Sequence, residues 1–164
     1  MNETIDIRPT DLSEPAEADA WLRLLDHYAR DPMGGGRPLS GDARAHLVER
    51  LRSRPDFVGM LAWAGSDVVG LANAFEGFST FAARPLLNLH DIVVRSDRRG
   101  RGIGQRLLRA MEAAARERGC CKLTLEVLSN NQRALASYRR FGFRDYQLDP
   151  DAGTARFMEK PIAT

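Results

Sequence analysis

A run of arginine and glycine residues near the middle of the chain has the composition of an anion-binding turn. It consists of Arg99, Gly100, Arg101, Gly102, Ile103 and Gly104. Apolar residues at helical spacing follow it, so the run lies where a helix begins. Glycines let a backbone approach a ligand closely, and the N–H groups at a helix N-terminus hold phosphate or pyrophosphate. We predict an anion cradle; a glycine-rich turn without a ligand is the alternative.

Two common phosphate motifs do not fit this run. A P-loop requires a lysine followed by serine or threonine after its last glycine, and no lysine is near. A dinucleotide-binding turn requires a third glycine three positions after Gly104, where the sequence has Leu107. If the run binds an anion, it therefore does so through neither of these two motifs.

Two motifs together make the chain resemble the GCN5-related N-acetyltransferases (GNAT). The central motif of that family is glutamine or arginine, two residues, glycine, one residue, then glycine or alanine, and Arg99, Gly102 and Gly104 match it. A second block lies about 30 residues downstream. It comprises Asn131, Ala134, Tyr138, Gly142 and Phe143.

The resemblance implies an α/β (α+β) GNAT fold and acetyl-CoA as co-substrate, with no metal. The expected fold is a mixed, six- to seven-stranded central sheet with splayed central strands, flanked by about four helices. The pantetheine arm would pair with a strand edge, the pyrophosphate would lie on the N–H groups of residues 100–105, and the two arginines would add charge or be solvated. The implied binding residues are Ile92, Val93, Val94, Arg99, Gly100, Arg101, Gly102, Ile103, Gly104, Gln105 and Asn131.

Tyr138 is the predicted general acid, because a hydroxyl near the thioester sulfur can protonate the departing thiolate. A tyrosine packed on the core is the alternative. Asn131 stands where a helix starts, so it is expected to cap that helix, and the resemblance adds a contact with the CoA arm.

A base, or a water relay, must remove a proton from the attacking amine, because an alkylammonium has a pKa near 10. His90 lies where polyamine-type members carry a carboxylate, and an imidazole is the side-chain type that ordinarily titrates near neutral pH. Glu126 lies where members that acetylate peptide N-termini have a glutamate. Asp91 is expected to face the opposite side of the strand from His90, which makes it a weaker candidate.

The elements that must position these residues follow the order β αα βββ α β α ββ. A glycine-rich loop at residues 31–41 joins the first two helices, residues 86–94 form the strand before the anion cradle, and residues 122–127 form the next. Two closing strands are predicted at residues 141–148 and 155–160.

Composition sets the remaining limits. A chain of 164 residues fits a single domain, 1–164. The absence of a signal-like start or a long apolar run predicts a cytoplasmic protein without a membrane partner. Arginine supplies 22 of the 24 basic residues, yet the net charge of +2 argues against a nucleic-acid-binding module.

The expected function is N-acetylation of a primary amine on a small molecule such as a polyamine, an amino acid or an antibiotic. Glu76, in the segment before residue 86, is a candidate contact for a cationic amine. Acetylation of a peptide or protein, at an N-terminus or a lysine, is one alternative. A non-catalytic acyl-CoA sensor is another, and family members often form homodimers, which the sequence itself does not show.

Overall fold

The computed structural model describes residues 4–162 and divides the chain into two compact units, Met1–Leu125 and Glu126–Thr164. The single domain, 1–164, expected from length stays a prediction. The elements of the first unit are β1 (Ile5–Pro9), α1 (Pro15–Arg30), η1 (Pro32–Gly34), α2 (Gly41–Arg52), β2 (Phe57–Ala64), β3 (Asp67–Ser79), β4 (Arg84–Val94), η2 (Ser96–Arg98), α3 (Ile103–Glu117) and β5 (Leu123–Leu125). The second unit holds α4 (Gln132–Phe141) and η3 (Pro150–Ala152).

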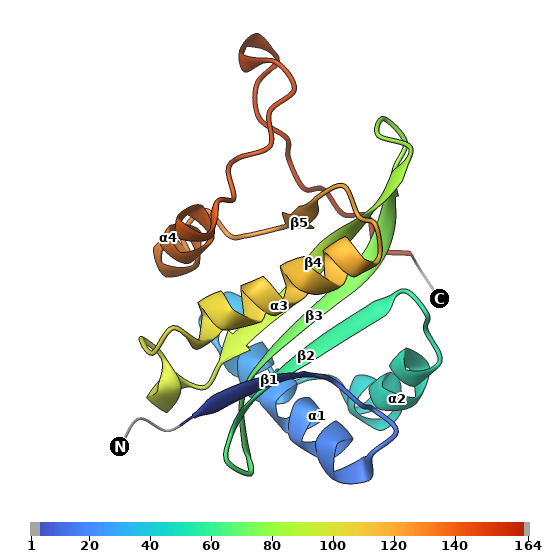
Figure 1. The fold of residues 1–164 in the computed structure, drawn as a ribbon, viewed down its shortest axis with the longest axis vertical. Helices are drawn as coiled ribbons and strands as arrows, with labels where there is room; N and C mark the ends of the chain where they lie inside the picture. The colour runs from blue at the N-terminus through green and yellow to red at the C-terminus, as the bar shows by residue number, and fades with distance from the viewer. Residues whose placement is uncertain (1–3, 163–164) are drawn as a thin grey trace. The chain divides into compact units, whose positions relative to one another are not determined.

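The first unit is built on a mixed sheet with the strand order β1-β2-β3-β4-β5 (Figure 1). The pairs β1–β2, β2–β3 and β3–β4 are antiparallel, whereas β4 and β5 run parallel to each other. The order of helices and strands predicted from the sequence is confirmed as far as α4, and so is the mixed sheet.

The predicted strand count is too high, because residues 141–148 and 155–160 contain no strand in the structure. Phe141 is the last residue of α4, and Gly142 ends that helix in the left-handed conformation. Leu148 and Phe157 are exposed, and no backbone ladder joins either segment to another strand. An extended segment without a neighbouring strand is not stable as a strand, so the described sheet has five strands.

Helices cover both faces of the sheet. Leu71 of β3 packs in one cluster with Trp21 and Leu25 of α1, whereas the adjacent Gly70 approaches Leu107 of α3. Because neighbouring strand residues point to opposite faces, α1 and α3 lie on opposite sides of the sheet. Within residues 4–162, no helix combines the length and apolar composition that crossing a membrane requires.

Candidate active site

The edge of β4 that faces β5 is open along its second half. The β4 to β5 ladder comprises only the pairs of residues 87–89 with residues 123–125, whereas the ladder with β3 continues to Val94. The predicted splaying of the central strands is thus present. Val93 faces the α1 cluster and Val94 lies toward Gly104 of α3. The unpaired edge at residues 92–94 therefore leads directly into the β4–α3 loop (residues 95–102).

Two glycines give the β4–α3 loop its shape. Gly100 has a φ of 79° and Gly102 a φ of 76°, a region that side chains with a Cβ adopt only under strain. Gly102 is also the N-cap of α3 and offers no side chain to cap the first turn. The first N–H groups of a helix have no partner within it, and the anion cradle predicted from the sequence depends on such groups.

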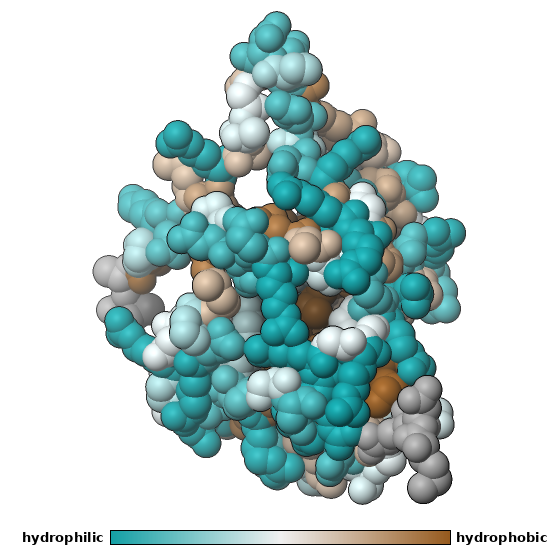
Figure 2. Space-filling model, turned by 90° about the vertical axis from the view of Figure 1, so that its left-hand side faces the viewer, coloured by the Kyte–Doolittle hydropathy of each residue, from teal (hydrophilic) through white to brown (hydrophobic). Residues whose placement is uncertain are grey.

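Gly104 is different, because the fold does not require a glycine there. A Cβ at this position would meet only Val94 Cγ2, at 3.9 Å, which is ordinary van der Waals contact. Figure 2 shows the side of the molecule on which the β4–α3 loop lies in Figure 1, and its surface is mainly hydrophilic, with small separate hydrophobic areas.

Arg99 contacts protein groups on both sides of the loop. Its Nε donates to the Val94 carbonyl at 3.0 Å, and its guanidinium lies 3.4 Å from an Asp31 carboxylate oxygen. The structure thus offers a role for Arg99 other than the predicted phosphate contact. The Arg101 side chain is exposed beside the glycines.

His90 occupies a β-bulge in β4. Ala74 of β3 pairs with Leu89 and Asn73 pairs with Asp91, which leaves His90 without a partner on β3. A bulge interrupts the alternation of side chains along a strand. The expectation that His90 and Asp91 face opposite sides is therefore wrong, as their contacts show.

Both side chains of the bulge lie on the face of the sheet that α1 covers. The His90 ring packs edge-on against Phe75, with ring centroids 4.8 Å apart. Asp91 accepts a hydrogen bond of 3.0 Å from the Asn73 side chain, and Asn73 accepts one of 2.9 Å from Trp21 Nε1 of α1. This chain holds the Asp91 carboxylate in place from within the core, because Trp21 is 0% and Asn73 2% exposed.

Electrostatics single out Asp91 within this group. Burial raises the pKa of the Asp91 carboxyl, and the hydrogen bond from Asn73 and the nearby His90 oppose that rise. Burial also raises the pKa of the Tyr28 phenol, with the carboxylates of Asp91 and Asp31 adding to the effect. A buried carboxyl with a raised pKa is typical of a functional site. One polar residue, Asn73, inside the apolar run of β3 was the sequence signal for this cluster.

The second unit brings Asn131 and Tyr138 together on one short helix. Asn131 is the N-cap of α4, and its side chain accepts a 3.1 Å hydrogen bond from the Ala134 N–H. The predicted cap is confirmed.

Tyr138 lies at the other end of α4, where its ring packs edge-on against Phe143 with centroids 5.8 Å apart. The N–H groups of Gly142 and Phe143 both donate to the Tyr138 carbonyl, at 3.1 and 3.0 Å. Gly142 has a φ of 113°, which explains the glycine of the second block. Tyrosine, glycine and phenylalanine thus form one helix-ending turn.

Glu126 and Glu76, the candidate base and the candidate amine contact, have surroundings that differ from those expected. Glu126 lies just beyond the last residue of β5 and is exposed, not within the strand. Glu76 forms an ion pair of 2.9 Å with Arg118 at the end of α3, so its charge is already balanced by the protein.

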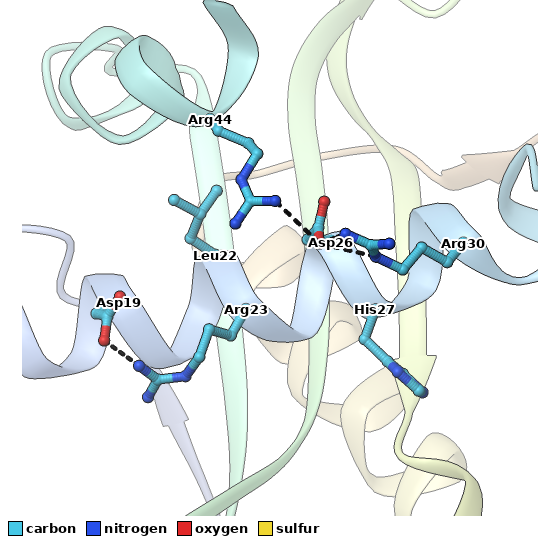
Figure 3. A pocket seen from close by; sticks show the side chains of 7 residues that line it. All are labelled: Asp19, Leu22, Arg23, Asp26, His27, Arg30 and Arg44. Atoms are coloured by element: carbon cyan, nitrogen blue, oxygen red, sulfur yellow. Dashed lines mark hydrogen bonds and ion pairs between the residues drawn. The ribbon is translucent and has the colours of Figure 1, made fainter. Parts of the chain in front are cut away.

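A cavity of about 300 Å³ lies along the outer side of α1, facing α2 (Figure 3). Its charges are largely balanced within the cavity: Arg23 pairs with Asp19, while Arg30 and Arg44 both pair with Asp26. Asp26 also accepts a 2.9 Å hydrogen bond from the Leu39 N–H. This cavity is therefore part of the scaffold that fixes the α1–α2 loop (residues 31–40).

Comparison with known proteins gives a consistent family match. The model of the Acetyltransferase (GNAT) family matches residues 21–143. Thialysine N-epsilon-acetyltransferase of Bos taurus is 36% identical over 81 residues, which are 49% of this chain and 47% of the relative. Streptothricin acetyltransferase of Streptomyces lavendulae is 41% identical over 86 residues, which are 52% of this chain and 43% of the relative. The chain thus spans about half the length of the curated relatives it matches.

The fold is shared over the whole chain with a solved structure, that of AAC(6')-Iy in complex with the bisubstrate analogue CoA-S-monomethyl-acetylneamine. The TM-score is 0.75 with 18% sequence identity, and the match covers 98% of this chain and 99% of the other. At this identity the likeness concerns the fold.

Proposed function

Because the chain belongs to the acetyltransferase (GNAT) family, we propose that it transfers an acetyl group from acetyl-CoA to a primary amine of a small molecule. One observation carries the proposal: the open edge of β4 runs without interruption into the glycine-lined loop and the N-terminus of α3. A strand edge that can pair with an amide-containing arm and an adjacent anion cradle match the two chemical parts of CoA.

The residues of the first unit fit acetyl-CoA. The backbone of Ile92, Val93 and Val94 would hold the pantetheine amides, and the N–H groups of residues 100–105 would hold the pyrophosphate. Gly104, for which the fold itself has no need, leaves room for that approach. When bound, acetyl-CoA supplies the thioester carbonyl that an amine can attack.

The bulge pair His90 and Asp91 is proposed to bind the acceptor amine and take its proton. Only the neutral amine is a nucleophile, and the Asp91 carboxylate attracts its ammonium form. Asn73 and Trp21 hold that carboxylate in one position. The raised pKa of Asp91 makes it a stronger base than an exposed aspartate. Glu126 remains the competing prediction.

Tyr138 is proposed as the general acid that protonates the departing thiolate. The turn formed with Gly142 and Phe143 fixes the end of the helix from which the phenol projects. Asn131 keeps the start of the same helix in place and is proposed to contact the CoA arm.

A small cationic amine is the proposed acceptor. The two curated relatives are named for thialysine and streptothricin, and the Asp91 carboxylate offers a negative charge beside the open edge of β4. A peptide or protein acceptor, or an acyl-CoA sensor without turnover, are the competing functions.

Release of CoA thiol from acetyl-CoA tests the proposal directly. The panel comprises thialysine, streptothricin, spermidine, lysine, an aminoglycoside and a peptide with a free N-terminus. We expect release with one class of small amine. Release with the peptide alone would move the acceptor to proteins, and acetyl-CoA binding without release on any acceptor would favour the sensor.

The proton acceptor is tested by the pH dependence of kcat/KM in His90→Gln, Asp91→Asn and Glu126→Gln. Loss of the base should lower kcat/KM by about 100-fold and remove the rise that accompanies its deprotonation. We expect this loss of kcat/KM and this change of pH profile in His90→Gln or in Asp91→Asn. An unchanged profile in both bulge variants, with a loss in Glu126→Gln, would assign the role to Glu126.

A further inference from the structure

We propose that Arg99 and Asp31 form a clamp that couples the β4–α3 loop to the α1–α2 loop. Through it, CoA bound at the first loop would fix the second loop beside the acceptor site. The inference rests on the proposed acetyl-CoA site. It makes Arg99 and Asp31 positioning residues, and it assigns the Arg99 side chain to the protein and not to a phosphate.

The Arg99 end of the clamp reaches two elements at once. Nε donates to the carbonyl of Val94, the last residue of β4, at 3.0 Å. A terminal nitrogen lies 3.4 Å from Asp31 Oδ2. Both side chains of the ion pair are about one-third exposed, so solvent weakens the attraction without removing it. The backbone of Arg99 directly precedes Gly100, where the pyrophosphate-binding N–H groups begin.

The Asp31 end organises the start of the α1–α2 loop. The other carboxylate oxygen, Oδ1, accepts from the Met33 N–H at 2.9 Å, and the Asp31 carbonyl accepts from Gly34 and Gly36. The Met33 hydrogen bond and then Arg99 hold the pKa of this carboxyl below its usual range. At Gly34 a Cβ would overlap the Tyr28 carbonyl. A displacement of Asp31 therefore moves the whole turn.

The opposite end of the loop is fixed independently. Asp26 accepts from the Leu39 N–H and is held in turn by Arg30 and Arg44. The loop is thus anchored to its own helices at Leu39 and to the β4–α3 loop through Asp31. Of these two anchors, the contact of Asp31 with Arg99 is the one that joins the loop to the proposed CoA site.

Tyr28 connects the clamp with the proposed reaction centre. The Asp31 N–H donates to the Tyr28 carbonyl at 2.9 Å. Burial is the main cause of the raised pKa of the Tyr28 phenol, and the negative charges of Asp91 and Asp31 raise this pKa further. A shift of the α1–α2 loop therefore alters the surroundings of the bulge pair.

Three variants isolate the clamp. Asp31→Asn removes the charge but keeps an oxygen for the Met33 N–H. Arg99→Gln keeps a donor for the Val94 carbonyl and a residue type that the family motif accepts, whereas Arg99→Lys keeps the charge. The control is Asp19→Asn, which breaks an ion pair with Arg23 on the outer side of the same helix.

Hydrogen exchange of the backbone N–H groups of residues 33–37 and of Leu39, with and without CoA, is the measurement, together with calorimetric CoA affinity. We expect CoA to slow exchange by about threefold to fivefold in the unchanged protein, Arg99→Lys and Asp19→Asn, the range for one partly exposed ion pair. In Asp31→Asn and Arg99→Gln the CoA affinity should stay within about twofold while the slowing disappears.

Two results would overturn the clamp while leaving the proposed function intact. One is that CoA slows hydrogen exchange in the α1–α2 loop equally in all variants. The other is a loss of CoA affinity in Arg99→Gln that Asp31→Asn does not share, because it would make Arg99 a phosphate ligand. Failure of the unchanged protein to bind CoA is a separate result: it would remove the proposed function, and the clamp with it.

Discussion

The two units of the chain hold their candidate functional residues in place by different physical means. In Met1–Leu125 the open edge of β4 and the bulge are held by side chains from α1, β3 and α3, several of which are completely buried. In residues 126–162 no residue is buried, and the second motif is a capped helix closed by a glycine turn. The β4 edge and the bulge depend on tertiary packing, whereas the motif of the second unit is built from contacts close in sequence.

This difference predicts where a mutation acts through folding and where it acts through chemistry. Substitutions around the bulge should change stability and activity together, because the same hydrogen bonds serve both. Substitutions in α4 should leave the core almost untouched.

Trp21→Ala should lower the free energy of unfolding by about 3–5 kcal/mol, the range for deleting a buried large aromatic side chain. It also leaves the buried Asn73 amide without its Trp21 partner. Phe143→Ala, the matched change in the second unit, should cost about 1 kcal/mol or less because that ring is only half-buried. Urea unfolding monitored by circular dichroism measures both, and equal losses would end the distinction between the two units.

Tyr138→Phe should lower kcat by about 10- to 1000-fold, since it removes a proton donor while keeping the ring that packs on Phe143. The affinity for acetyl-CoA and the unfolding midpoint should stay unchanged. Tyr146→Phe is the control, because Tyr146 is an exposed tyrosine of the same unit. Full activity in Tyr138→Phe would remove this hydroxyl from the mechanism.

Gly102→Ala should destabilise the protein by about 1–3 kcal/mol, because Gly102 has a φ of 76° and an alanine there is strained. Gly104→Ala should not, because that position is helical and has room for a Cβ. Thermal unfolding of the pair separates a glycine needed by the fold from one needed by the ligand. Similar losses at both positions would contradict that separation.

Asn131→Ala should have the smallest effect, about 1 kcal/mol, the usual cost of losing a helix N-cap. The loss should appear as fraying of α4 in hydrogen exchange and leave the amides of β2 and β3 unaffected. Asn131→Asp should restore the cap, because aspartate accepts the same hydrogen bond from Ala134. Simultaneous loosening of β2 and β3 would show that the two units unfold together.

The sequence predicts the fold wherever local chemistry decides the outcome. The glycine and arginine run, the amphipathic helix after it and the cap at Asn131 all follow from residue types and spacing. The closing strands could not be judged this way: a short run with apolar residues, such as Phe157 and Met158 within 155–160, is compatible with a strand. A strand also requires a neighbour, which the sequence does not reveal.

The candidate site was predicted less completely, and the bulge is the reason. Alternation along residues 86–94 assigns Asp91 to the wrong side of the sheet, since one inserted residue reverses every later side chain. The contact of Arg99 with Asp31 joins residues 68 positions apart, and no local pattern carries that information. Asn73 was detectable only as a polar residue in an apolar strand.

The central claim is that the open edge of β4 and the N-terminus of α3 bind acetyl-CoA, and calorimetric titration with acetyl-CoA tests it most directly. We expect micromolar binding to the unchanged protein, binding within about twofold in Gly104→Ala, which the family motif accepts, and at least about tenfold weaker binding in Gly104→Leu. Circular dichroism should show that both variants are folded. No binding to the unchanged protein, or equal binding in all three, would contradict the assignment of this site.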